Sequence, residues 1–104
     1  MGQLVVYHDE GGGITQESLK FWQSIKQPGW RRFRITCHRY SQCFNTEVTC
    51  WDFDNNYIII LLSGFSVGYG GEGPNGLVKL LADCGFPPNL TKNAVFTEDA
   101  IEFG

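Results

Sequence analysis

The longest apolar run in the chain is Tyr57-Ile58-Ile59-Ile60-Leu61-Leu62. Turn-forming residues flank it, with Asp54-Asn55-Asn56 before it and Ser63-Gly64 after it. A buried helix is one interpretation, but the β-branched content and the flanking turns favour a strand. Because the run is apolar at every position, this strand is expected at the centre of a sheet with both of its faces covered.

A second strand is predicted between residues 30 and 40, where apolar and polar residues alternate. Its inner face would carry Phe33, Ile35 and Cys37. The positions on its half-exposed outer face are Arg32, Arg34, Thr36 and His38. Residues 44–53 have the Val, Thr and Trp content of an antiparallel partner, and residues 4–8 are predicted to form the first strand.

Two helices are predicted from the spacing of apolar residues. The first is capped by Thr15 and ends before Gln27-Pro28-Gly29. The second begins at Pro74 or Asn75 and ends at Gly85. Residues 65–69 are predicted to continue the sheet, residues 94–96 to form a last short strand, and residues 97–103 to form a turn or an edge segment.

These elements predict a single compact α+β domain over residues 1–104. Its core would be a mainly antiparallel sheet of four to six strands with two short helices. The composition is that of a globular protein, because 42% of the residues are hydrophobic and 18% are charged. A chain of 104 residues is long enough for one hydrophobic core.

Charge and hydropathy disfavour two classes of protein, namely general nucleic-acid binders and membrane-spanning proteins. The formal net charge is −3, which disfavours a general nucleic-acid binder, although six of the eight basic residues lie between Lys20 and Arg39. No apolar run is long enough to span a bilayer and no leader pattern is visible, so a cytoplasmic protein is expected.

The cysteines do not suggest a metal or a cofactor. The four are Cys37, Cys43, Cys50 and Cys84, and they lack the close pairs that structural zinc sites use. They are expected to be mostly buried apolar residues, with disulfides as the alternative in an oxidising compartment. No metal and no cofactor are therefore expected.

The glycine-rich stretch over residues 68–76 is the leading candidate for a binding site. It contains five glycines in nine residues and leads into the second predicted helix. Such a loop can turn its N–H groups inward toward an anion. Leu77-Val78 stands where a P-loop requires Lys and Ser/Thr, so the stretch is not a triphosphate-hydrolysis motif. The alternative is that the glycines only make a sharp strand-to-helix connection.

The segment from Trp30 to Tyr40 is the second candidate, because it carries all four arginines of the protein. Arginine forms two-point contacts with phosphate or carboxylate groups, so Arg32, Arg34 and His38 could supply charge to a ligand. The alternative is a solvated strand face that Glu47 partly neutralises.

The leading functional hypothesis is non-enzymatic binding, which includes sequestration, of a small phosphorylated, nucleotide-like ligand. Glycine N–H groups, the Tyr69 ring, and side chains that carry charge or accept hydrogen bonds would hold it. The candidate ligand-binding residues are Arg32, Arg34, His38, Tyr69, Gly70, Gly71, Glu72, Gly73, Asn75 and Gly76. A dimer could form such a site from the glycine loop of one chain and the arginines of another.

The alternative function is an inhibitor or immunity-type protein that binds a protein partner. The aromatic and arginine-rich strand, with Trp30 and Tyr40 exposed, would supply the interface. Catalysis is disfavoured, since neither histidine accompanies a recognisable nucleophile motif. An acid/base pair at His8-Asp9-Glu10 is the one catalytic arrangement that the sequence suggests.

Overall fold

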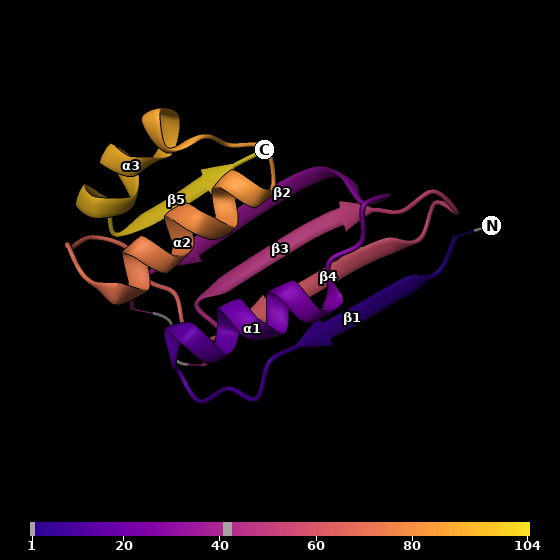
Figure 1. The fold of residues 1–104 in the computed structure, drawn as a ribbon, viewed down its shortest axis with the longest axis horizontal. Helices are drawn as coiled ribbons and strands as arrows, with labels where there is room; N and C mark the ends of the chain where they lie inside the picture. Colours follow the sequence, from indigo (N-terminus) through magenta and orange to yellow (C-terminus); the bar gives the residue numbers. More distant parts are fainter. Residues whose placement is uncertain (1, 41–42) are drawn as a thin grey trace.

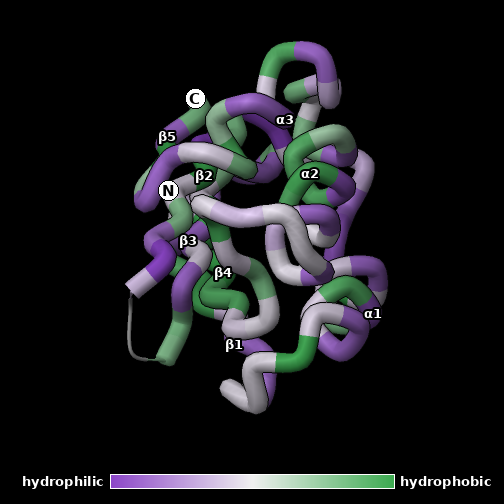
Figure 2. Tube along the Cα trace, turned by 90° about the vertical axis from the view of Figure 1, so that its left-hand side faces the viewer, coloured by the Kyte–Doolittle hydropathy of each residue, from purple (hydrophilic) through white to green (hydrophobic). Residues whose placement is uncertain are grey.

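The computed structural model describes residues 2–40 and 43–104. Within these residues, three helices pack on one face of a five-stranded sheet, which makes an α+β fold (Figures 1 and 2). The elements are β1 (Leu4–His8), α1 (Thr15–Ile25), β2 (Arg31–His38), β3 (Thr46–Trp51), β4 (Tyr57–Leu62), α2 (Glu72–Asp83), α3 (Pro88–Thr97) and β5 (Ala100–Phe103). None of the helices in this part of the chain is long and apolar enough to cross a membrane.

The strands lie in the order β1-β4-β3-β2-β5. β1 runs parallel to β4, and the other neighbours are antiparallel, so the sheet is mixed rather than purely antiparallel. The register places Val6 beside Ile59, Ile59 beside Thr49, and Thr49 beside Arg34. Facing side chains from four strands therefore form one row across the sheet.

β4 is an interior strand next to the edge strand β1, and it is covered on one face only, which corrects the expectation of a central strand with two covered faces. Ile58, Ile60 and Leu62 are buried beneath the helices. The alternate residues of β4 are only half-buried, because no helix in the described chain covers that side of the sheet (Figure 2). We call this helix-free side of the sheet the outer face.

The second half of the chain holds three further differences from the prediction, one of which adds a third helix to the two expected. Residues 65–69 do not form a strand, and α2 begins at Glu72, before the predicted start at Pro74 or Asn75. The predicted strand over residues 94–96 is instead part of α3. Pro88 is the first residue of that helix, where its fixed φ fits and its missing N–H removes no hydrogen bond.

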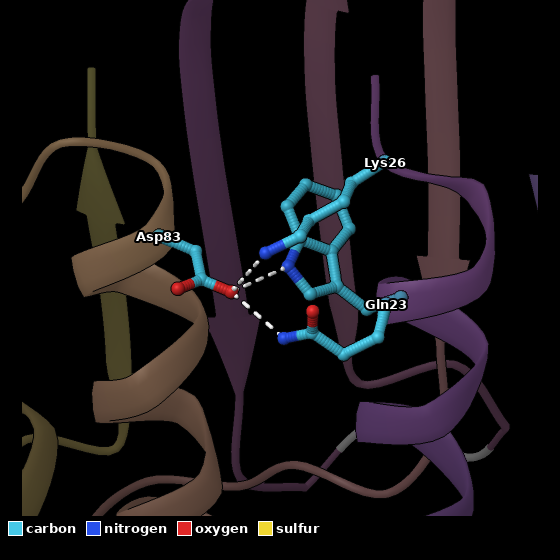
Figure 3. Close-up of polar contacts among 4 residues, drawn as sticks. Gln23, Lys26 and Asp83 are labelled. Carbon is cyan, nitrogen blue, oxygen red and sulfur yellow. Dashed lines mark hydrogen bonds and ion pairs between the residues drawn. The ribbon is translucent and has the colours of Figure 1, made fainter. Parts of the chain in front are cut away.

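Helices α1 and α2 are linked at one end by the carboxylate of Asp83 (Figure 3). Its Oδ2 accepts hydrogen bonds from Trp22 Nε1 at 3.0 Å, Gln23 Nε2 at 3.1 Å and Lys26 Nζ at 3.3 Å. Trp22 is buried, whereas Lys26 is exposed. The indole bond is therefore the contact that cannot be replaced easily by water.

We expect Asp83→Ala to lower the free energy of unfolding by about 1–2 kcal/mol, because it leaves the buried Trp22 N–H without a partner. Lys26→Ala should change it by less than about 0.5 kcal/mol, since the ion pair is exposed. Urea unfolding followed by tryptophan fluorescence measures both values. An equal loss in the two variants would show that the ion pair, rather than the indole bond, stabilises the helix pair.

All four cysteines are free thiols, and three of them lie in the core. Burial raises the pKa of Cys37 to about 11, and it raises those of Cys50 and Cys84 to about 12. Cys43 is exposed. The expectation of mostly buried cysteines is confirmed for Cys37, Cys50 and Cys84.

Thiol labelling should therefore distinguish Cys43 from the rest. At pH 8 we expect a disulfide reagent to label one thiol per chain quickly in the native protein and four in denaturant, because only thiolates react and three of the thiols stay protonated and buried. Absorbance of the released reagent gives the count. Cys43→Ser should abolish the fast phase, and rapid native labelling of a second thiol would contradict the burial of the core cysteines.

Candidate functional site

The arginines of β2 do not follow simple alternation. The β2–β3 register shifts between Arg31 and Arg34, and Arg32 has a φ of +58° within this irregular stretch. Arg31 pairs with Trp51 and Arg34 with Thr49, so these two arginines share the outer face. The prediction that Arg32 aligns with Arg34 in a regular strand is therefore wrong, because the bulge inserts one extra residue.

Arg34 and His38 both lie on the outer face of β2, but their environments differ. Arg34 Nη2 is 2.8 Å from Glu102 Oε1 on the neighbouring strand β5. His38 is exposed at the end of β2, where it pairs with Ala100. The charge of Arg34 is thus already matched within the sheet.

The glycine-rich stretch is divided between an exposed loop and a buried helix surface. Gly73 and Gly76 lie inside α2 and are buried. Asn75 Nδ2 donates to the carbonyl of Gly71 at 2.8 Å, so this side chain closes the first turn of the helix. The members of the predicted site that remain exposed here are Tyr69, Gly70, Glu72 and Asn75.

Arg39 is the arginine that meets this loop. Its guanidinium lies 5.2 Å from the centre of the Tyr69 ring and 5.3 Å from that of Tyr40. Its Nη1 donates to the carbonyl of Gly68 at 3.2 Å and lies 3.7 Å from Asp99 Oδ1. We call these five residues the Arg39 cluster.

The structure thus separates the two halves of the predicted ligand site. Arg34 and His38 belong to the outer face, whereas Tyr69 belongs to the Arg39 cluster. Sequence reasoning counted Arg39 among the arginines but gave it no role. Arg39 directly follows the last residue of β2. Binding residues are often found in loops at strand ends, so this position could have indicated its role.

A buried polar network joins the loop after β1 to the loop after β4, at the carboxyl ends of the parallel pair. The carboxylate of Asp9, which is 6% exposed, accepts hydrogen bonds from the hydroxyl of Ser18, the N–H of Gly11, and both the N–H and the hydroxyl of Ser63. Ser18 Oγ in turn accepts from the N–H of Gly64. Four donors converge on one carboxylate, so the network fixes how β1 and β4 enter their loops.

Two opposing effects act on the acidity of Asp9. Burial raises the pKa of its carboxyl, but the hydrogen bonds from Ser18, Ser63 and Gly11 outweigh burial and leave the pKa below its ordinary value. His8 is exposed on the other side of the strand, with its Nδ1 2.8 Å from the backbone oxygen of Asp9. The two side chains therefore do not form the acid/base pair that the sequence suggested.

A cleft of about 560 Å³ lies beside this network, along one side of α1. Its lining includes Glu10, Ile14, Glu17, Lys20 and Phe21. Glu17 and Lys20 are 3.9 Å apart, so the only basic group of the lining is close to an acidic one. This mixed, partly acidic lining does not suit a phosphate, and none of the predicted ligand-binding residues lines it.

The outer face is left uncovered by the three helices of the described chain and carries exposed apolar side chains. Leu4 and Val6 of β1 are 63% and 51% exposed, and Trp51 of β3 is 37% exposed against Tyr57. Trp30, predicted to be an exposed contact, is instead buried against Trp22, with ring centres 6.1 Å apart. The aromatic residues on this face include Trp51 and the half-buried Tyr57, neither of which the sequence analysis had singled out as a contact.

Searches with the sequence and with the fold found no matching protein family, no matching curated protein and no matching solved structure. Within residues 2–40 and 43–104, no group of three or more His, Cys, Asp or Glu side chains gathers in a way that could hold a metal ion. The function is therefore inferred from the surfaces of the molecule itself.

Proposed function

We propose that the protein binds a protein partner through the outer face of its sheet, without catalysing a reaction. The observation that supports this most is the group of apolar side chains on the helix-free side of the sheet, which are exposed on β1 and half-buried on β4. Exposed apolar patches on small proteins mark interaction surfaces, because burying them against a partner releases ordered water.

The chemistry of the face fits such an interface. The apolar part consists of β1 and β4, where Leu4, Val6 and Ile59 lie side by side. The ion pair between Arg34 and Glu102 lies toward the opposite edge. An apolar area next to charged residues is common in protein–protein interfaces, in which Trp and Arg contribute much of the binding energy.

The action of such a protein is to cover a surface of its partner, as inhibitors do. The backbone of a sheet is rigid, since ladder hydrogen bonds hold each interior strand on both sides and the edge strand β1 on one side. Little backbone entropy is therefore lost when such a face docks. No proton transfer and no nucleophile is needed for this function.

Matched leucines test this proposal. Leu4 lies on the outer face and is 63% exposed, and Leu90 lies on α3 and is 66% exposed. A partner captured from the native host and then purified should bind Leu90→Ala as it binds the unmodified chain. Trp51→Ala should weaken binding about 30-fold and Leu4→Ala about 5-fold, by the usual cost of truncating a central and a lesser contact. Equal losses for Leu4→Ala and Leu90→Ala would refute the outer face as the interface.

A second candidate function is binding of a small anionic, nucleotide-like ligand at the Arg39 cluster. It is favoured by one observation: the Arg39 guanidinium lies 5.2 Å and 5.3 Å from the centres of the Tyr69 and Tyr40 rings, and Tyr69 comes shortly before Gly71, which precedes α2 without a side-chain cap. Aromatic rings stack on bases, and a helix start offers free N–H donors to a phosphate.

Calorimetric titration with nucleotides and cyclic dinucleotides tests this second candidate. Binding should be lost in Arg39→Ala and kept in Arg34→Ala, because Arg34 is paired with Glu102 on the outer face. Absence of heat with every nucleotide would remove the candidate, and ligand recovered intact after release would distinguish sequestration from turnover.

A further inference from the structure

β1 is an edge strand, and within residues 2–40 and 43–104 no other strand lies along its free side. Among the described residues it pairs with β4 alone. The N–H of Asp9 donates to the carbonyl of Leu61, and the carbonyl of Gln3 accepts from Tyr57. Because the backbone groups of alternate residues point to opposite sides of a strand, Leu4, Val6 and His8 direct theirs away from β4. These groups form an unpaired ladder.

Natural proteins protect such an edge with charge, proline, a bulge or short length. β1 has five residues, no proline and no bulge, and neither lysine nor acid within it. The opposite edge differs, because β5 has four residues and carries Glu102, which is paired with Arg34. The asymmetry indicates that β1, rather than β5, is the edge that takes a further strand.

We propose that two copies of this chain pair through antiparallel β1 strands, which joins their sheets into one. A two-fold axis at Val6 sets Val6 opposite Val6 of the second copy, and Leu4 opposite His8. In that register each of these residues exchanges its N–H and carbonyl with the residue opposite, as in a hydrogen-bonded antiparallel pair. β1 is thus complementary to itself.

The distribution of charge favours a second copy as the occupant. The chain has a formal charge of −3, so two copies repel unless their acidic groups are kept apart. The acidic residues next to β1 are Asp9 and Glu10. In this register Glu10 of each copy lies opposite Gly2 of the other, which separates the two Glu10 residues by about 27 Å along the strands. That distance exceeds the screening length of roughly 8 Å at physiological salt.

Pairing about this axis also places the outer faces of both copies on the same side of the joined sheet. The exposed Leu4 and Val6 of both copies then lie together on one continuous outer face. Such a dimer doubles the width of the face without using it, so the pairing does not depend on the partner binding proposed above. The partner-binding test and the dimer test can therefore fail separately.

Sedimentation velocity tests the pairing with two matched lysine variants. Val6 and Thr49 belong to the same row of the outer face, with β4 between them. The unmodified chain should sediment at twice its mass of 11.7 kDa. Val6→Lys should shift it to the mass of one chain, since two lysines would stand directly opposite each other, whereas Thr49→Lys should remain a dimer.

Each other outcome overturns the proposal. A single-chain mass for the unmodified protein at every concentration excludes the dimer, and dissociation by both lysines assigns the contact to the outer face instead of the edge. Leu4→Lys serves as a second edge variant if Val6→Lys does not fold by circular dichroism. Amide exchange should also be slowed at Leu4, Val6 and His8 in the dimer relative to the edge variant, and unprotected amides at these residues would exclude strand pairing.

Discussion

Asp9→Asn is expected to lower the free energy of unfolding by about 3 kcal/mol. The carboxylate oxygen Oδ2 accepts from the N–H of Ser63, and Oδ1 accepts from the N–H of Gly11. An asparagine amide has one acceptor and one donor, so its NH₂ group must face a backbone N–H whichever way it turns. The substitution keeps the shape of the side chain but removes its negative charge and the match between donors and acceptors.

Chemical unfolding in urea measures this loss, and Glu10→Gln is the matched control. Glu10 is the exposed neighbour of Asp9, so its amide should change the free energy of unfolding by less than about 0.5 kcal/mol. A small change for Asp9→Asn would mean that the loops after β1 and β4 readjust around the amide.

The same carboxylate predicts how stability depends on pH. The pKa of Asp9 is lower in the folded chain than in the unfolded one, so the unfolded state takes up a proton first as the pH falls. The contribution of Asp9 is therefore complete above about pH 4 and is lost progressively below it. Asp9→Asn should unfold with a smaller dependence on pH in that acid range, and an unchanged acid slope would contradict this origin.

Gly76→Ala is the second large effect that we expect, with a loss of about 2 kcal/mol. A Cβ at this position would lie 2.4 Å from Thr15 Cγ2 and 3.0 Å from the Phe65 ring. Both neighbours are buried, and Thr15 Oγ1 is held by a hydrogen bond of 2.6 Å to the carbonyl of Gly64. The methyl group cannot rotate away without breaking that bond. The overlap therefore outweighs the gain of about 1 kcal/mol in helix propensity.

Two comparisons make the Gly76 prediction specific. Gly70→Ala should be nearly neutral, because no heavy atom outside its neighbours in sequence lies within 4 Å of the added Cβ. Thr15→Ser removes the methyl group and keeps the hydroxyl, so the double variant with Gly76→Ala should recover most of the loss. Urea unfolding of the four chains gives the coupling energy, and additive losses would show that Thr15 is not the obstacle.

The positions of several strands could be predicted from the sequence, whereas strand pairing and the docking of helices on the sheet could not. The predictions for residues 4–8 and 57–62 are confirmed, because each segment carries its own β-branched signal. That β4 is covered on one face only depends on where the helices dock, which no local pattern encodes. The parallel pairing of β1 with β4 is also invisible locally, since it joins segments far apart in the chain.

The errors in the candidate site have equally specific causes. The glycines after Tyr69 were interpreted by their backbone freedom, yet Gly73 and Gly76 are buried inside α2, and Gly76 lets this helix approach Thr15 of α1 closely. Alternation placed Arg32 on the outer face, but a bulge of one residue gave that place to Arg31. Residues 94–96 were predicted as a strand, but they belong to α3, which begins at Pro88 because proline suits the first position of a helix. The role of Asp9 depends on donors from three separate segments.

The parallel pair has a consequence for the order in which the sheet is made. β2, β3 and β4 pair with their neighbours in sequence, but Leu4 must reach Tyr57. Closing that longer loop costs roughly 1.5 kcal/mol more than closing a hairpin. During translation β1 leaves the ribosome well before β4, and it has no partner until β4 has followed. The strand that is made earliest in this sheet therefore joins it late, and its apolar side chains stay in contact with water through most of synthesis.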